Sequence, residues 1–266
     1  MAVFQRIPWW LQSFGVLAVF SLVLIGWQIA VAGLQIQPII LPSPARVWEA
    51  FEREQWTLMK GFGVTASAAC AALGLSITIG SLIAVLFSFS RWMRLTFYPY
   101  VIFLQTVPIV AIAPLLITWF GYGIQTIIVV ATIISLFPII SNVTTGLISV
   151  DSGFIDLFRL NSASRWQTLW KLQIPSAVRS LILGARISCG LAVIGAIVGE
   201  FFVGETSTSA AGLGTLIAGW QRMSKTDAMI AAIFCSTLLG LFVLGSVNLL
   251  SRLLLHRWTN DNFENQ

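Results

Sequence analysis

Long stretches of the chain carry no charged residue, and their lengths set the first expectation about its fold. A membrane-crossing helix needs about 20 mainly apolar residues, because each residue adds about 1.5 Å to a path of about 30 Å. The longest uncharged stretch, residues 95–150, has 56 residues, and Gly121 and Gly123 permit a tight turn near its middle. It therefore predicts two spans rather than one. Six spans are expected in all, at residues 14–31, 61–87, 96–119, 124–148, 177–202 and 228–250.

The composition agrees with a chain that lies mostly in a lipid bilayer. Of the 266 residues, 57% are hydrophobic and 9% are charged, whereas a soluble domain has about 25% charged residues. The mean hydropathy is +0.89. Residues 1–266 are therefore expected to form a single all-α transmembrane domain. The net charge of +5 comes from scattered basic residues, so it does not indicate a nucleic-acid partner.

Residue types that bind metals or catalyse reactions are scarce. Cys70, Cys189 and Cys235 lie in apolar runs without metal-ligand spacing, and His256 is the only histidine. The predicted spans hold one carboxylate, Glu200, which disfavours an intramembrane enzyme built on grouped carboxylates or a nucleophile–base pair. A secondary transporter is the other alternative. Such proteins commonly show repeat symmetry and paired ionisable residues near the midplane, and neither is evident here.

The distribution of lysine and arginine orients the chain in the membrane. With a cytoplasmic N-terminus, the inside segments hold nine of these residues and the outside segments five, with Arg186 inside the fifth span. Because inside loops carry the excess of positive charge, both termini and residues 151–176 are expected in the cytoplasm. Residues 30–32 resemble a signal-peptidase site, but the long uncharged run before them favours a retained first helix.

A first amphipathic segment follows the first span. Val47, Trp48, Phe51 and Trp56 recur at roughly helical spacing among charged residues. This pattern predicts an amphipathic helix that lies on the outer membrane face, with a solvated linker as the alternative.

A second amphipathic segment, residues 151–176, lies between the fourth and fifth spans. Asp151 is suited to cap a helix, Ser162 and Ser164 form a bend, and Pro175 is expected to end a second short helix. Such helices must bury their apolar faces, either on lipid headgroups or in a groove of another protein. The apolar positions are Phe154, Leu157 and Phe158 in the first helix, then Trp166, Leu169 and Trp170 in the second.

This segment resembles the loop that marks the permease subunits of bacterial ABC importers. In that pattern an acidic residue precedes two small residues, and a glycine follows six positions after the acid. Asp156 takes the place of the acid and Ser162 that of the glycine, while Leu157 and Phe158 depart from the small pair. The resemblance implies that the loop docks on a separate ATPase. The implied docking residues are Asp156, Leu157, Phe158, Arg159, Ser162, Ala163 and Ser164.

Four further stretches are similar to one branch of these permeases, which transports nitrate, sulfonates, taurine, pyrimidine precursors or riboflavin. They are "LPSPARVWEAF" after the first span, "QTVPIVAIAPLLITWFGYG" at 105–123, "FPIISNVTTG" at 137–146 and "GLGTLIAG" at 212–219. The match spans about residues 38–255. It leaves two groups of substrates open: pyrimidine precursors or riboflavin-like molecules, and anions such as nitrate, bicarbonate, sulfonates or taurine.

The resemblance also implies an architecture and a set of partners. It implies the type I ABC importer permease fold, with two permease copies in a bacterial plasma membrane and a periplasmic or lipid-anchored solute-binding protein. No stretch fits the G-x-x-x-x-G-K-[ST] pattern that cradles nucleotide phosphates, so this chain is expected to be a transport subunit without its own ATPase. No cofactor is expected in the chain, because ATP and Mg²⁺ would bind the partner ATPase.

Polar residues within the spans are candidates for the translocation route. Gln105, Thr106 and Pro108 lie in the third span, where proline frees a backbone carbonyl that a water-filled cavity or a neighbouring helix must satisfy. Asn142 and Glu200 occupy the fourth and fifth spans. Intramembrane polar residues usually face a cavity or a partner, although helix packing is the alternative for each.

Two other features of the fifth span allow two interpretations each. Arg186 can extend toward the membrane surface or contact the solute, and the first is favoured. Gly195 and Gly199 form a G-x-x-x-G pattern, which permits close helix packing either within the chain or between two copies.

Overall fold

The computed structural model describes residues 9–203 and 211–256, and every regular element within them is a helix, as the predicted all-α class requires. Arg6 and Arg257, which contribute to the charge count, lie outside these residues. The elements are α1 (Trp9–Gly33), α2 (Pro44–Arg53), α3 (Gln55–Phe89), α4 (Arg91–Thr106), α5 (Ile109–Phe120), α6 (Ile124–Ile148), α7 (Ser152–Leu160), α8 (Arg165–Thr168), a π-helical turn (Leu169–Gln173), α9 (Ile174–Val203), α10 (Leu213–Arg222) and α11 (Thr226–His256).

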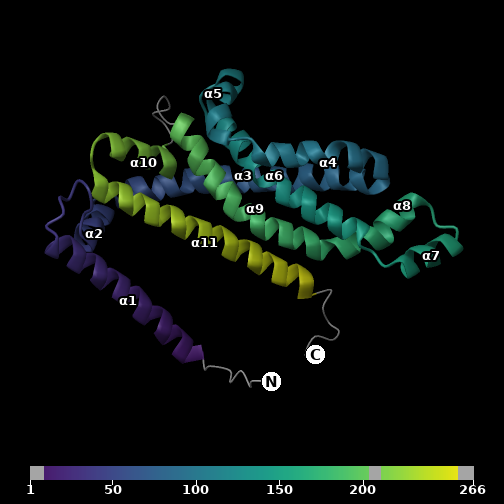
Figure 1. Ribbon diagram of the computed structural model, residues 1–266, viewed down its shortest axis with the longest axis horizontal. Helices are drawn as coiled ribbons and strands as arrows, with labels where there is room; N and C mark the ends of the chain where they lie inside the picture. Colours follow the sequence, from purple (N-terminus) through teal and green to yellow (C-terminus); the bar gives the residue numbers. More distant parts are fainter. Residues whose placement is uncertain (1–8, 204–210, 257–266) are drawn as a thin grey trace.

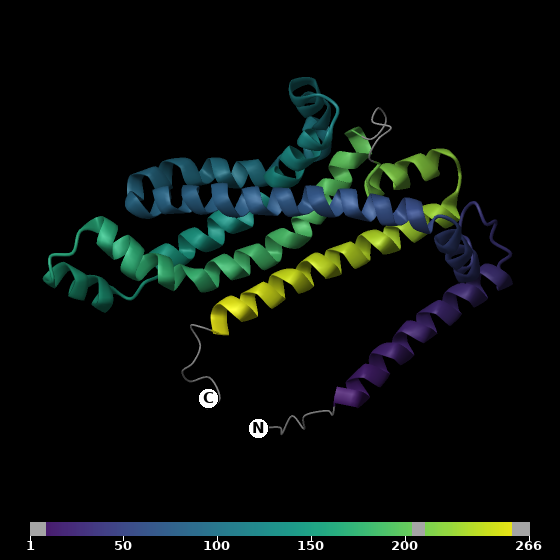
Figure 2. The ribbon, with the colours of Figure 1, turned by 180° about the vertical axis from the view of Figure 1, so that it is seen from behind.

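Four long helices, α3, α6, α9 and α11, lie side by side and form the body of the molecule (Figure 1). The short helices α2 and α10 lie at one end of this bundle, and α7 and α8 project from the other (Figures 1 and 2). We call these the α2/α10 end and the α7/α8 end. α11 runs from the α2/α10 end toward the α7/α8 end, and α1 extends away from the bundle.

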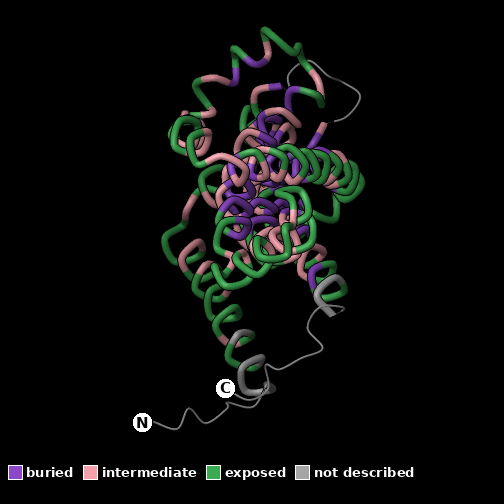
Figure 3. The backbone as a smooth tube through the Cα atoms, turned by 90° about the vertical axis from the view of Figure 1, so that its right-hand side faces the viewer, coloured by how far each residue is buried: buried purple, intermediate pink, exposed green. Residues whose placement is uncertain are grey.

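Buried residues gather along the axis of the bundle, as the end-on view shows (Figure 3). The contact between α6 and α9 depends on glycine. A Cβ on Gly195 would stand 2.6 Å from Ala131 Cα, and one on Gly199 would stand 3.1 Å from Ile127 Cα. The G-x-x-x-G pattern therefore serves packing within the chain, because only glycine permits this approach of the two backbones.

Four of the six predicted spans correspond to helices that are long and apolar enough to cross a membrane. These are α3, α6, α11 and the helix that continues through α9. The predicted first span falls on α1, whose apolar part among the residues searched, Leu17–Gly33, is shorter than a full span. Length and composition thus support four spans, or five if the bent pair α4–α5 is one span.

The predicted third span, residues 96–119, is not a continuous helix. α4 and α5 meet at an angle of 98° on either side of a short break. Val107 has the extended backbone angles φ −65° and ψ 124°, and Pro108 follows it. A proline ring disfavours the helical conformation of the residue before it, which explains why α4 stops here. Pro99 and Pro114 are accommodated inside α4 and α5.

Contacts at the α2/α10 end tie α2 to the start of α11. A helix forms after the first span, as predicted, and its buried residues are Val47 and Ala50. It ends at Arg53, so Trp56 lies on α3, and Trp48 is exposed rather than buried with Val47. Arg53 forms an ion pair with Asp227 at 3.1 Å, and this hydrogen bond raises the pKa of Arg53 above its ordinary value. The Thr226 hydroxyl also donates to the Ile39 carbonyl at 2.6 Å. These contacts fix one end of the bundle.

Candidate docking hairpin and solute cavity

The α7–α8 hairpin projects beyond the helical bundle, and its own sequence defines its fold (Figures 1 and 2). The Asp151 carboxylate accepts a hydrogen bond of 2.7 Å from the Gly153 N–H and caps α7, as predicted. Asp156 and Arg159 form an exposed ion pair at 3.2 Å. Such a surface pair adds little stability, so both side chains remain available to a partner.

A Schellman turn ends α7. The Ser162 N–H donates to the Arg159 carbonyl at 2.9 Å, and the Ala163 N–H donates to the Phe158 carbonyl at 3.0 Å. Ser162 has φ +56°, the left-handed conformation that glycine adopts most readily. The left-handed backbone explains why the ABC importer permease pattern has a glycine at this position, and in this chain Ser162 adopts the same conformation.

Ser164 begins α8 immediately after this turn. Its hydroxyl accepts from the Gln167 N–H at 3.2 Å, and the Gln167 side chain accepts from the Ser164 N–H at 2.8 Å. This reciprocal capping box satisfies two backbone donors at the helix start. The predicted docking residues from Asp156 to Ser164 therefore lie on the last part of α7 and on a turn of fixed geometry.

The hairpin exposes much of its apolar surface. Both predicted helices carry large side chains that are more than half exposed, namely Phe154, Leu157, Leu160, Trp166 and Trp170. A short projecting element with so many exposed aromatic and aliphatic groups requires a covering surface.

The connection from the hairpin to the bundle differs from the prediction. Pro175 was expected to end the second helix, but helical structure continues from Arg165 to Val203. The π-helical turn Leu169–Gln173 directly precedes this part of α9. Proline has no N–H to donate to the carbonyl one turn earlier, and its ring crowds that carbonyl. The wider π-helical turn tolerates both effects, so the helix continues instead of stopping. α8 and α9 therefore form one continuous path from the hairpin into the bundle.

Two apolar contacts fix the hairpin on the bundle. Leu169 is 1% exposed and belongs to a buried cluster with Leu147 and Ala177. The Trp166 ring packs edge-on against Phe89 at the end of α3, with ring centroids 5.1 Å apart. The hairpin is therefore packed both on the start of α9 and on the corner between α3 and α4.

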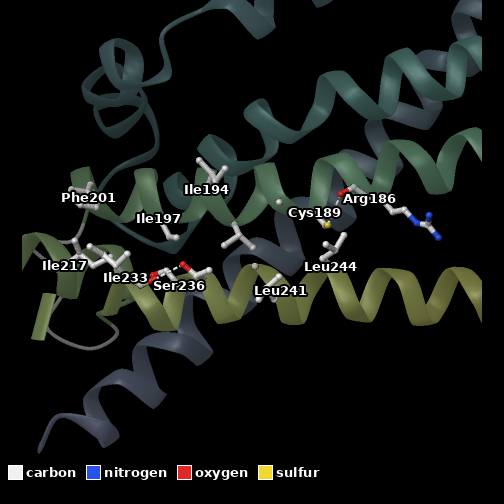
Figure 4. A pocket seen from close by; sticks show the side chains of 14 residues that line it. Arg186, Cys189, Ile194, Ile197, Phe201, Ile217, Ile233, Ser236, Leu241 and Leu244 are labelled. Atoms are coloured by element: carbon white, nitrogen blue, oxygen red, sulfur yellow. Dashed lines mark hydrogen bonds between the residues drawn. The ribbon is translucent and has the colours of Figure 1, made fainter. Parts of the chain in front are cut away.

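A cavity of about 630 Å³ lies between α9 and α11 (Figure 4). Its walls are mostly apolar, and the hydroxyl of Thr237 within it donates to the Ile233 carbonyl of its own helix at 3.0 Å. Arg186 is the one charged lining residue, but its guanidinium points away from the other lining side chains and donates to Ser251 at 3.1 Å. The favoured interpretation of Arg186 agrees with this orientation.

The proposed route residues in the third and fourth spans do not share one site. Gln105, Thr106 and Pro108 lie at the break between α4 and α5, and all three are exposed. Asn142 is half-buried on α6, where its side-chain amide donates to the Pro138 carbonyl at 2.8 Å. None of these residues lines the cavity between α9 and α11. A direct contact of any of them with solute stays a prediction.

Glu200 is fully buried in a network that joins three helices. Its carboxylate accepts from the Thr65 hydroxyl of α3 at 2.8 Å and from the Gly214 N–H of α10 at 2.7 Å. The Leu213 N–H donates to the Thr65 oxygen at 2.8 Å. Side chains of α3 and α9 thus cap the first turn of α10, where an anionic group is favourable. A solute contact of Glu200 stays a prediction.

Two glycines make this network possible. A Cβ on Gly212 would overlap the Glu200 carboxylate, and one on Gly214 would overlap the Ile197 carbonyl. The "GLG" portion of the stretch at 212–219 therefore permits the start of α10 to lie directly on α9. Thr65, Gly212 and Gly214 were not predicted to contact Glu200. A glycine pair at a helix start, close in sequence to the only carboxylate of the predicted spans, is the signal that was available.

The family model of binding-protein-dependent transport system inner membrane components matches residues 76–256. The match covers the projecting hairpin and Glu200. The chain belongs to this family. Its fold is that of a type I ABC importer permease, and the protein is a membrane-embedded transport subunit with several apolar helices.

Two of the proteins similar to this chain in sequence are permeases for a formylaminopyrimidine and for riboflavin. The formylaminopyrimidine transport permease ThiX of Halalkalibacterium halodurans is 30% identical over 89% of this chain and 92% of its own length. The riboflavin transport system permease RibX of Chloroflexus aurantiacus is 32% identical over 96% of this chain and 92% of its own length. These similarities support the branch to which the sequence motifs pointed.

A solved structure supports the fold independently. A chain of the MetNI methionine ABC transporter, in an inward-facing conformation, matches with a TM-score of 0.65. The match covers 76% of this chain and 97% of that chain at 20% sequence identity. The helical arrangement is therefore shared, although most residues differ.

Proposed function

We propose that this chain is the permease subunit of an ATP-driven importer and that separate ATPase subunits grip the α7–α8 hairpin. The observation that carries the proposal is the exposed apolar face of the hairpin, borne on a fixed turn and joined to α9 by continuous helical structure. ATP binding would close the ATPases and move the hairpin. The helices would then alternate between outward-open and inward-open arrangements through packed rigid elements.

The proposal places the α7/α8 end in the cytoplasm and the α2/α10 end outside. The excess of lysine and arginine in the segments assigned to the cytoplasm supports this orientation. A solute-binding protein would then deliver solute at the α2/α10 end, and two copies of the permease would enclose the route. The multi-pass chain would lie in a bacterial plasma membrane with both termini inside.

For the substrate we propose a pyrimidine precursor or a riboflavin-like molecule. The apolar cavity between α9 and α11 supports a ring-bearing solute, because apolar walls suit aromatic faces and the guanidinium of Arg186 points away from the cavity. ThiX and RibX, which transport such compounds, add support. A small anion such as nitrate, bicarbonate, a sulfonate or taurine would require a charged or donor-rich contact elsewhere in the assembled transporter.

Co-purification and reconstitution test the proposed mechanism. The chain would be expressed with a candidate ATPase and a candidate solute-binding protein from the same organism, purified, and reconstituted into proteoliposomes with an ATP-regenerating system. We expect a stable complex whose solute uptake requires ATP and both partners. Uptake by the permease alone under an ion gradient would instead identify a secondary transporter. Chemical conversion of a lipid by the purified chain would identify an intramembrane enzyme.

The ligand of the binding protein tests the substrate assignment separately. Mass spectrometry of the purified binding protein, followed by calorimetric titration, should identify a pyrimidine or flavin compound. Selective binding of a sulfonate, taurine, nitrate or bicarbonate would overturn the ring-compound assignment and leave the transport mechanism intact.

A further inference from the structure

A second cavity, of about 320 Å³, lies between α4 and α6 near the α7/α8 end of the bundle. It is lined by Arg94, Leu95, Tyr98, Pro99, Thr144, Thr145 and Ile148. Arg94 lies three residues after the first residue of α4, and Ile148 is the last residue of α6. At about 1.5 Å per residue, Arg94 and Thr144 lie about 5–6 Å from these helix ends, and Pro99 lies about 12 Å from the start of α4. The headgroup layer is about 5–8 Å thick on each side of a bilayer, so Arg94 and Thr144 lie at its depth.

The positive charge in this cavity has no counter-ion in residues 9–203 and 211–256. Among the described residues, the Arg94 guanidinium has no ion pair and no side-chain hydrogen bond. It is the only charged residue that lines the cavity, and α6 carries no charged residue along its whole length. The nearest acid beyond α6, Asp151, is engaged with the backbone N–H of Gly153. A half-buried cation without a counter-ion favours an anionic ligand.

A buried hydroxyl beside the same cavity also lacks a partner. Thr144 lines the cavity and is 3% exposed, and its buried oxygen has no hydrogen-bond partner within the described part of the chain. The adjacent Thr145 hydroxyl donates to the Ser141 carbonyl of its own helix at 2.9 Å. An unsatisfied buried hydroxyl is costly, so rotation of the Thr144 side chain that brings its hydroxyl to an acceptor in the cavity is favourable.

We propose that this cavity binds the headgroup of an anionic phospholipid from the cytoplasmic leaflet. Arg94 would pair with the phosphodiester, Thr144 would donate to one of its oxygens, and Leu95 and Ile148 would contact the glycerol and the first acyl carbons. Basic pockets between transmembrane helices on the cytoplasmic side are suited to such headgroups. At about 320 Å³ the cavity is far larger than the roughly 30 Å³ of one water molecule, so a phosphodiester fits.

The position of the cavity gives the lipid a role in coupling. Arg94 follows Phe89 by five residues, and Phe89 packs on Trp166 of the hairpin. A lipid held between α4 and α6 would therefore steady the corner on which α8 rests. The cytoplasmic location of this corner rests on the proposed function, whereas the binding of an anionic headgroup does not.

Lipid titration of the purified full chain tests the proposal. Binding of phosphatidylglycerol and of phosphatidylcholine would be measured by native mass spectrometry and by the shift in melting temperature. We expect phosphatidylglycerol to bind preferentially and to raise the melting temperature of the wild-type chain. Arg94→Gln should weaken this binding roughly tenfold, as the loss of one charged hydrogen-bonded contact does, and Thr144→Val by a smaller factor.

Matched variants and a soluble anion keep the test decisive. Arg91→Gln removes an equal charge from the start of α4 but does not line the cavity, so it should retain preferential binding. If Arg94→Gln fails to fold, Arg94→Lys and Thr144→Val provide the comparison, with partial and reduced binding expected. Equal losses in Arg91→Gln and Arg94→Gln would mean diffuse attraction to an anionic surface and would overturn the proposal. Inorganic phosphate that reproduces the shift would overturn the lipid assignment in favour of a soluble anion.

The lipid-binding test can fail or succeed independently of the test of ATP-driven uptake. Preferential lipid binding with no ATPase complex would leave the lipid site standing and remove the proposed transport mechanism. ATP-driven uptake with no lipid preference would do the reverse.

Discussion

Phe89, at the end of α3, packs edge-on against Trp166 of α8 with a centroid distance of 5.1 Å. This contact joins the projecting hairpin to a helix that is not adjacent to it in the sequence. α8 already continues into α9 through the π-helical turn. The Phe89–Trp166 contact adds a second route, toward α3 and α4. We therefore expect a movement of the hairpin to act on both sides of the bundle.

Removal of the Phe89 ring should reduce coupling between ATP hydrolysis and transport. An edge-to-face aromatic pair contributes about 0.5–1.5 kcal/mol beyond its buried area, so Phe89→Ala should loosen α8 without unfolding the bundle. We expect fewer solute molecules transported per ATP hydrolysed in proteoliposomes. Trp166→Ala should have the same effect, and the double variant should be no worse than either single variant. Trp92→Ala, at an exposed ring close to this corner, is the control and should leave the ratio unchanged.

Bulk or charge at Ala163 should uncouple transport more severely. Ala163 is half-buried on the turn, and its N–H closes the Schellman motif at Phe158. Ala163→Glu retains that backbone hydrogen bond but places a charged side chain on the implied docking surface. We expect a folded permease, judged by its elution volume and melting temperature, that no longer drives uptake with its ATPase. Normal uptake by Ala163→Glu would rule out this surface as the docking site; Ala163→Ser serves as the conservative control.

Glycine at position 162 should rigidify the hairpin. Serine at φ +56° carries a cost of roughly 1 kcal/mol that glycine avoids. Ser162→Gly should therefore retain transport and slow hydrogen exchange of the α7 amides about fivefold, the factor that corresponds to 1 kcal/mol. Ser162→Val should accelerate the same exchange, because a β-branched residue fits this conformation poorly. Faster exchange in Ser162→Gly would show that the turn is not closed in the way described.

The sequence was sufficient for features that depend on local chemistry. Uncharged stretches located α3, α6, α9 and α11, and the carboxylate at position 151 marked the start of α7. The sequence was insufficient where the outcome depends on how neighbouring backbones pack. Pro108 breaks a helix and bends the chain by 98°, whereas Pro175 lies within a continuous helical path because a π-helical turn precedes it. The presence of a proline alone does not show whether the helix breaks, as at Pro108, or continues, as at Pro175.

The candidate site was predictable to the same degree. The predicted docking residues, which the family resemblance implied, all lie between positions 156 and 164, so local capping and periodicity were enough to predict that they share one hairpin. The route residues come from three different spans, and their relation depends on helix rotation, which composition does not determine. Glu200 illustrates the limit: its burial follows from Thr65, located 135 positions earlier, and from glycines that follow it.

A paired substitution should show that Glu200 and Gly212 share one space. In the wild-type background, Gly212→Ala places a methyl group on the Glu200 carboxylate and should lower the melting temperature of the purified permease. Glu200→Ala alone should also destabilise the protein, by about 1–3 kcal/mol, because the buried Gly214 N–H loses its acceptor, whereas the Thr65 hydroxyl can still donate to the Gly61 carbonyl at 3.0 Å. In the double variant the methyl group occupies the space that the carboxylate vacates. The loss of stability in the double variant should therefore be smaller than the sum of the two single-variant losses, and the difference is the coupling energy of the contact.

Gly219→Ala, where a Cβ meets no neighbouring atom within 4 Å, is the matched control, and its effect on stability should be additive with that of Glu200→Ala. Strict additivity of Gly212→Ala with Glu200→Ala in thermal unfolding would mean that α10 does not begin on the Glu200 carboxylate.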